Sequence, residues 1–145
     1  MRLALFICFF ALLTSASAVT LISENFATPP NFPTGWTKTG PSTSNWSVVT
    51  GNEAGGTSGE LKFNFTPSTN GTYRFISPAI DTRKVHDMAM SFRHFLSDYN
   101  GSSGSYTLVV QVSNNLNTWT NVWSQTVSAN IPATEVNFTI PFNYG

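Results

Sequence analysis

Residues 88–113 read MAMSFRHFLSDYNGSSGSYTLVVQVS, and this stretch decides the class of the fold. From Tyr106 to Ser113 large apolar side chains recur at every second position, which is the period of a half-buried β-strand. The segment DYNGSSGS between the two apolar runs has the composition of a turn. The run from Met88 to Leu96 has unequal faces, as expected for a strand in a sandwich. One face carries Met88, Met90, Phe92 and His94, and the other carries Ala89, Ser91, Arg93 and Phe95.

Similar runs lie on both sides of this stretch. Leu61, Phe63 and Phe65 alternate with polar residues, and we expect them to form the core face of one strand. The chain is 14% aromatic and poor in Lys and Glu, which favours strands over helices. The sequence therefore predicts an all-β fold, a two-sheet antiparallel jelly-roll sandwich of about eight short strands. The further predicted strands are Leu21–Phe26, Trp46–Val49, Leu61–Phe65, Tyr73–Ser77, Asn121–Val127 and Val136–Ile140.

The N-terminus has the pattern of a secretory signal peptide. Arg2 precedes the apolar run Leu3 to Leu13, and the small residues Ala16-Ser17-Ala18 predict cleavage after Ala18. The apolar run is about half as long as the roughly 20 residues that span a bilayer, and no later segment approaches that length. We therefore expect residues 1–18 to be a signal peptide and residues 19–145 to be one exported β-sandwich domain without a membrane anchor.

Cysteine content and charge exclude several classes of function. Cys8 is the only cysteine and lies in the predicted signal peptide, so the exported domain has no disulfide, thiolate nucleophile or cysteine-ligated zinc. Only 10% of the residues are charged and the formal net charge is zero, which excludes nucleic acid and anionic membrane as expected partners. A hydrophobic core must hold such a domain together.

Several short motifs share their order and spacing with a known family. They are SENF at Ser23 to Phe26, FPTGW at Phe32 to Trp36, NWSV at Asn45 to Val48, ISPAID at Ile76 to Asp81, SFRHF at Ser91 to Phe95, and the run from Ser97 to Ser124. In these motifs the chain resembles the secreted choice-of-anchor J or cleaved-adhesin domains, which are similar to MAM-type and galactose-binding-like jelly rolls. The resemblance covers nearly the whole exported chain and implies a non-catalytic role in adhesion or ligand binding.

The C-terminal end departs from that family. Its members usually close with an aromatic strand that contains a Tyr/Trp-Ile-Asp-Asp segment, and bacterial members often add a sorting module. Neither follows the last predicted strand here. We therefore expect the domain to be incomplete at its C-terminus, with an open sheet edge that favours strand exchange or self-association.

The ionisable residues predict no active site. Seven Asp and Glu residues and two His show no recognised catalytic spacing. His86 lies in the charged segment DTRKVHD, which we interpret as a solvated connection, and His94 lies in a strand. We expect a surface or hydrogen-bonded structural role for both histidines.

A structural calcium ion is one ligand that the resemblance implies. Related jelly rolls often hold a cation between the start of the first strand and the loop beside the glycine-rich turn. The candidates there are Glu24 and Asp98, with Asn100 as a neutral oxygen ligand. The alternative is that both carboxylates cap turns or are exposed.

The tryptophans suggest a second kind of site. Aromatic faces pack well against the apolar faces of sugars, so exposed tryptophans can form a carbohydrate platform. Trp36 and Trp119 lie in predicted loops and are the candidates. The alternative is that tryptophans fill the core, which we expect for Trp46 and Trp123 because they lie in predicted strands.

These observations favour a secreted or cell-surface domain that binds an extracellular glycan or protein. One alternative is an accessory domain of a larger secreted hydrolase, such as a peptidase. A second alternative is a structural spacer of a surface protein, which would bind no ligand.

Overall fold

The computed structural model describes residues 18–97 and 106–141, and these residues form a β-protein. They contain eight strands, one short 3-10 turn at Thr43–Asn45 and no α-helix. None of the described residues belongs to a helix long and apolar enough to cross a membrane. The predicted all-β class is therefore confirmed, while nearly all of the predicted signal peptide lies outside the described residues. The strands are β1 (Thr37–Thr39), β2 (Trp46–Val49), β3 (Glu60–Phe63), β4 (Arg74–Ile76), β5 (Met88–Leu96), β6 (Tyr106–Val112), β7 (Thr120–Val127) and β8 (Ile131–Ile140).

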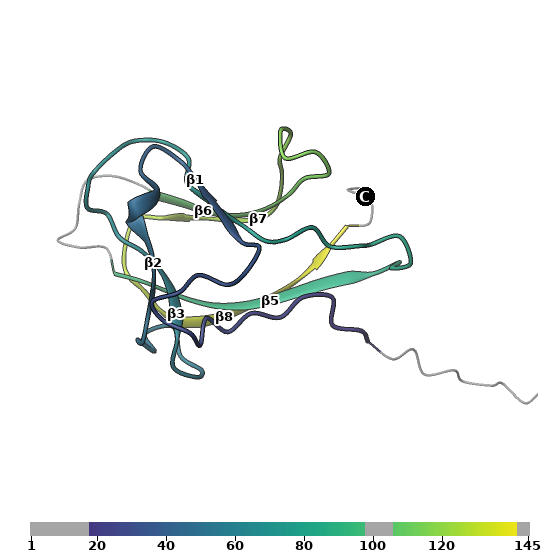
Figure 1. Ribbon diagram of the computed structural model, residues 1–145, viewed down its shortest axis with the longest axis horizontal. Coiled ribbons are helices and arrows are strands. Elements are labelled where there is room, and N and C mark those ends of the chain that lie inside the picture. Colours follow the sequence, from purple (N-terminus) through teal and green to yellow (C-terminus); the bar gives the residue numbers. More distant parts are fainter. Residues whose placement is uncertain (1–17, 98–105, 142–145) are drawn as a thin grey trace, which may run out of the picture.

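The described strands pair antiparallel in four two-stranded ribbons. The pairs are β1–β4, β2–β3, β5–β8 and β6–β7. In Figure 1 the long β5–β8 ribbon runs along one side of the molecule and the β6–β7 ribbon along the other. No closed two-sheet sandwich forms among these residues, because each ribbon is hydrogen-bonded only within itself. Strands β1 and β4 are three residues long, which leaves them few ladder bonds to offer to a second neighbour.

The predicted first strand, Leu21–Phe26, is wrong. Side chains take the backbone donors there: Glu24 Oε1 accepts from the Phe26 N–H at 2.7 Å and Asn25 Oδ1 accepts from the Ala27 N–H at 3.2 Å. Phe26 also has a positive φ of 54°, which no extended strand tolerates. Short polar side chains that bond to nearby backbone groups compete with ladder formation.

The predicted core face of the third strand is also partly wrong. Strand β3 ends at Phe63, whose side chain is 42% exposed, and Phe65 beyond it is 57% exposed. The cause is Asn45, which is 2% exposed and donates from Nδ2 to the carbonyl oxygens of Asn64 (2.7 Å) and Pro67 (3.0 Å). These bonds draw the chain out of the ladder after Phe63, so Phe65 does not reach the core.

The β5–β8 and β6–β7 ribbons face one another through aromatic side chains. Phe92 on β5 meets Trp123 on β7 edge-on, with ring centroids 5.1 Å apart, and Phe138 on β8 at 6.4 Å. The alternation predicted for β5 is confirmed from Phe92 to Leu96, whereas Met90, which was predicted on the same face as Phe92, is exposed. Phe92 and His94 are half-buried on the inner face, whereas Arg93 is exposed on the other face and pairs with a glutamate of β8.

His94 lies in this inner layer, with its ring 5.8 Å from Trp123 and 5.6 Å from Phe92. Both of its ring nitrogens are buried and have no hydrogen-bond partner among the described residues. The expected surface or hydrogen-bonded role is therefore wrong for His94. Burial lowers the pKa of its imidazole below the ordinary value, because the charged form would lose hydration.

Phe75 on β4 is the centre of a second aromatic cluster. Its ring stacks on Trp36 at 4.9 Å with an interplanar angle of 19°, and lies 5.7 Å from Trp46. Phe26 and Phe32 complete the cluster at 6.0 and 5.8 Å. Such offset and tilted pairs are favourable geometries. The cluster joins the N-terminal loops to strands β2 and β4.

Few apolar side chains are fully buried. Among the described residues they are Val48, Val127 and Ile131, at 3%, 3% and 9% exposure. Most of the packing is therefore supplied by half-buried aromatic rings. The rings between the two long ribbons and the cluster around Phe75 together act as the core.

The replacement Phe75→Ala should destabilise the fold strongly. Removing a half-buried ring that touches four others should lower the free energy of unfolding by about 2–4 kcal/mol. The same deletion in Phe65→Ala is the matched control, and we expect a change within about 0.5 kcal/mol because Phe65 is exposed. Urea unfolding of both variants measures the difference, and equal losses would contradict the central role of Phe75.

His94 should make stability depend on pH. Its folded-state pKa is lowered, so below about pH 6.5 the unfolded chain takes up a proton that the folded chain does not yet accept. The free energy of unfolding should therefore fall as pH drops through that window and be unaffected by His94 above it. Replacing the imidazole by an apolar ring, His94→Phe, should flatten the slope between neutral pH and about pH 5.5 in denaturant titrations. The His86→Gln variant should keep it; a slope unchanged by His94→Phe would contradict the assignment.

Candidate functional site

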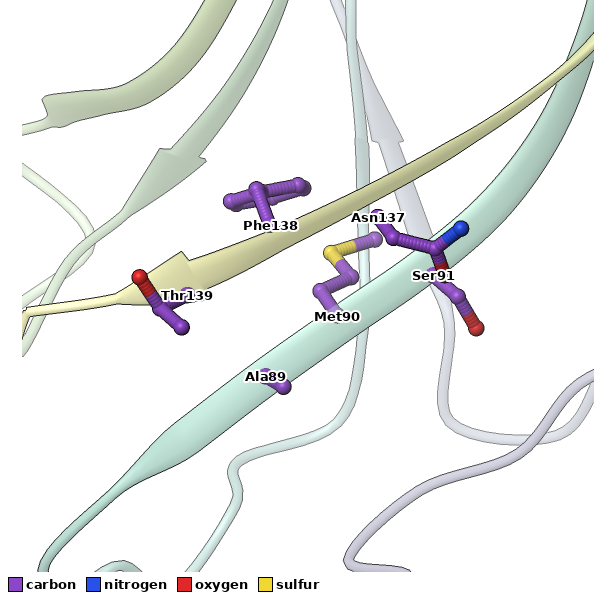
Figure 2. A pocket seen from close by; sticks show the side chains of 6 residues that line it. All are labelled: Ala89, Met90, Ser91, Asn137, Phe138 and Thr139. Carbon is purple, nitrogen blue, oxygen red and sulfur yellow. The ribbon is translucent and has the colours of Figure 1, made fainter.

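The β5–β8 ribbon borders one hollow, and a second lies beside Trp119. The larger has a volume of about 410 Å³ and lies against the paired strands β5 and β8 (Figure 2). Met90 and Phe138, which are opposite one another in the ladder, supply its large apolar side chains. The described residues that line this hollow include no ionisable side chain, so they offer neither a charge nor an acid or base. The remaining lining residues are Ala89, Ser91, Asn137 and Thr139.

The smaller hollow has the richer chemistry. Its volume is about 160 Å³, and it lies where β4 and β2 meet the β6–β7 ribbon. Aromatic side chains dominate its lining, and a guanidinium and an amide lie among them. We call it the Trp119 cavity, and its lining residues are Trp46, Tyr73, Arg74, Phe75, Ile76, Val109, Gln111 and Trp119.

Arg74 is held in place by two neighbours. Its Nε donates to Gln111 Oε1 at 2.9 Å, and Gln111 Nε2 in turn donates to Asn121 Oδ1 at 2.8 Å. The guanidinium carbon lies 5.0 Å from the centroid of the Trp119 ring, within the range of a cation–π contact. This chain of contacts links β4 to β6 and β7 and orients the one cation that the described residues place in the cavity wall.

Trp119 is fixed by the loop that precedes it. Its indole Nε1 donates to the carbonyl oxygen of Leu116 at 3.2 Å. Asn115 Oδ1 accepts from the backbone N–H groups of Asn117 (2.9 Å) and Thr118 (2.8 Å), an Asx turn that shapes the loop. The ring is therefore positioned before any ligand arrives.

Trp46 also lines the cavity, which the sequence did not predict. We expected it in the core because it lies in a strand, but it is half-buried and shares the wall with Trp119. Its indole Nε1 is buried and has no acceptor among the described residues. Trp46 belongs to the NWSV motif noted in the sequence, but nothing in that motif indicated that it would lie beside Trp119, which is distant in sequence.

The two predicted sugar-stacking tryptophans lie apart. Trp119 lines the cavity, whereas Trp36 does not; Trp36 stacks on Phe75, which forms part of the cavity wall. Trp36 therefore contacts the cavity wall through Phe75 without lining the cavity itself. Trp123 packs between the two long ribbons, as we expected of a core residue.

The predicted calcium ligands are only partly described. Glu24 is exposed, and its carboxylate accepts the Phe26 N–H, which matches the turn-capping alternative. Asp98 and Asn100 lie outside the described residues. Within residues 18–97 and 106–141, no three His, Cys, Asp or Glu side chains gather closely enough to hold a metal ion. The calcium site stays a prediction.

Comparisons with protein-family models, with curated proteins and with solved structures found no match to this chain. The resemblance to choice-of-anchor J domains therefore remains an expectation from the sequence motifs. The Trp119 cavity is therefore the feature of this chain that bears on its function.

Proposed function

We propose that this chain is a secreted, non-catalytic β-domain that binds extracellular carbohydrate, with the Trp119 cavity as its ligand site. The observation that carries the proposal is the wall of that cavity, in which Trp46, Tyr73 and Trp119 surround a fixed guanidinium. Sugars present apolar C–H faces to aromatic rings and hydroxyl groups to polar side chains. An aromatic wall with a few oriented donors can contact both the C–H face and the hydroxyl groups of a sugar.

The proposal also includes a jelly-roll fold and secretion from the cell. The two long ribbons that face one another through Phe92 and Trp123 are compatible with the two layers of a jelly roll. The signal-peptide pattern supports secretion to the medium or the cell surface. The motifs shared with cleaved-adhesin domains favour a role in adhesion.

The size of the cavity limits what it can hold. At about 160 Å³ it is smaller than the roughly 300 Å³ at which pockets for drug-sized ligands begin, so it suits one sugar ring of a longer chain. Contacts to a single ring give weak affinity per site. Densely displayed or polymeric glycans are therefore the suitable probes, since avidity multiplies weak single-site binding.

The Trp119→Ala variant should lose glycan binding. A glycan array and polysaccharide pull-downs with the full chain should reveal at least one bound glycan, and the variant should bind it at least about tenfold more weakly, as loss of a ring contact worth ~1.5 kcal/mol implies. Phe65→Ala is the matched control, because it removes an exposed aromatic ring that does not line the cavity.

Two results would count against this proposal. A folded wild-type chain that binds no glycan, with or without added calcium, favours the structural spacer. Undiminished binding by Trp119→Ala would move the ligand site elsewhere. Thermal melts of both variants separate lost binding from lost folding.

A further inference from the structure

Arg74 is a half-buried cation that has no acidic partner among residues 18–97 and 106–141. The ion pairs among the described residues join Arg83 to Asp81 and Arg93 to Glu135, and neither involves Arg74. Its Nε bonds to the neutral oxygen of Gln111, and no acceptor for its two terminal nitrogens is found in the described part of the chain. Among the described residues that line the cavity there is no Asp or Glu.

This arrangement leaves one side of the guanidinium free for an anion. A guanidinium has five N–H donors, and within the described part of the chain only the Nε donor of Arg74 has a hydrogen bond. The terminal pair of nitrogens matches the spacing of two carboxylate oxygens, which makes the Arg–carboxylate contact bidentate and stronger than a neutral hydrogen bond. Gln111 and Trp119 hold the guanidinium, so little side-chain entropy remains to be lost on binding.

We propose that the Trp119 cavity takes an acidic sugar, a uronate unit whose carboxylate binds the terminal nitrogens of Arg74 while its ring lies against the aromatic wall. This inference rests on the proposed carbohydrate function and names its substrate class. A carboxylate is favoured over the sulfate groups of highly charged polymers because Arg74 is the only cation among the described residues of the lining. Sulfated chains are held by clusters of cations, and the formal net charge of this protein is zero.

Esterification gives a direct test. Polygalacturonate and its methyl ester share one ring and one linkage, and they differ only at the carboxyl group, which is charged in the acid and carries an uncharged methyl ester in the other polymer. Alginate and hyaluronate with their carboxyl-reduced forms extend the comparison to other uronates. Affinity electrophoresis of the wild-type chain at low ionic strength should show at least one acidic polymer bound about tenfold more tightly than its neutral form. Added salt should narrow that ratio, because it screens the contact.

Three variants locate the effect. Arg74→Gln should reduce binding of the acidic polymer to the level of the neutral form, whereas Lys84→Gln removes the same charge from the exposed 81–87 connection and should change nothing. Gln111→Glu places a carboxylate of the same size beside Arg74. It gives up the hydrogen bond from Gln111 Nε2 to Asn121 but gains an ion pair with Arg74, so it should abolish the preference while the chain stays folded in thermal melts. This variant keeps the test decisive if Arg74→Gln fails to fold.

The outcomes separate this inference from the proposed function. Equal binding of acidic and neutral polymers overturns the acidic-sugar inference and leaves carbohydrate binding intact. No binding of any glycan overturns both. Equal losses in Arg74→Gln and Lys84→Gln, or tighter binding of heparin than of every uronate polymer, would show a non-specific charge effect and overturn the assignment to Arg74.

Discussion

The packing of aromatic rings around Phe75 is the constraint on which the rest of the structure depends. The described residues have no cysteine to cross-link them and very few fully buried apolar side chains, so half-buried rings have to hold short ribbons together. Phe75 touches Trp36 on one side and Trp46 on another, and thereby fixes two loops and two strands at once. It also forms part of the cavity wall, so the core and the candidate site share one side chain.

The position of the candidate site follows from how the ribbons meet. Strand β4 pairs with β1, yet its Arg74 reaches across to Gln111 on β6, and this bridge closes one side of the Trp119 cavity. The edge-on contact of Phe92 with Trp123 holds the β6–β7 ribbon against the β5–β8 ribbon. An aromatic wall beside one oriented cation is the arrangement on which the proposed binding function rests.

Local patterns predicted several elements well. Strands β2 and β5 have the predicted bounds, and β6 begins at the predicted Tyr106, because alternation is a property of consecutive residues. The failures come from side chains that bond to the backbone. The Glu24 carboxylate accepts the Phe26 N–H, and the predicted strand does not form there. Asn45 donates to two carbonyl oxygens beyond β3, which ends at Phe63 and leaves Phe65 exposed.

By itself the sequence determined the all-β class, the alternation of β5 from Phe92 to Leu96 and the absence of cysteine from residues 19–145. It also marked Trp119 as a candidate for ligand contact. Only the tertiary structure decided which strands pair, and that Trp46 and Arg74 join Trp119 while Trp36 does not. The physical reason is distance along the chain: Arg74 and Gln111 are 37 residues apart, and their contact depends on ring packing between ribbons that no local pattern encodes.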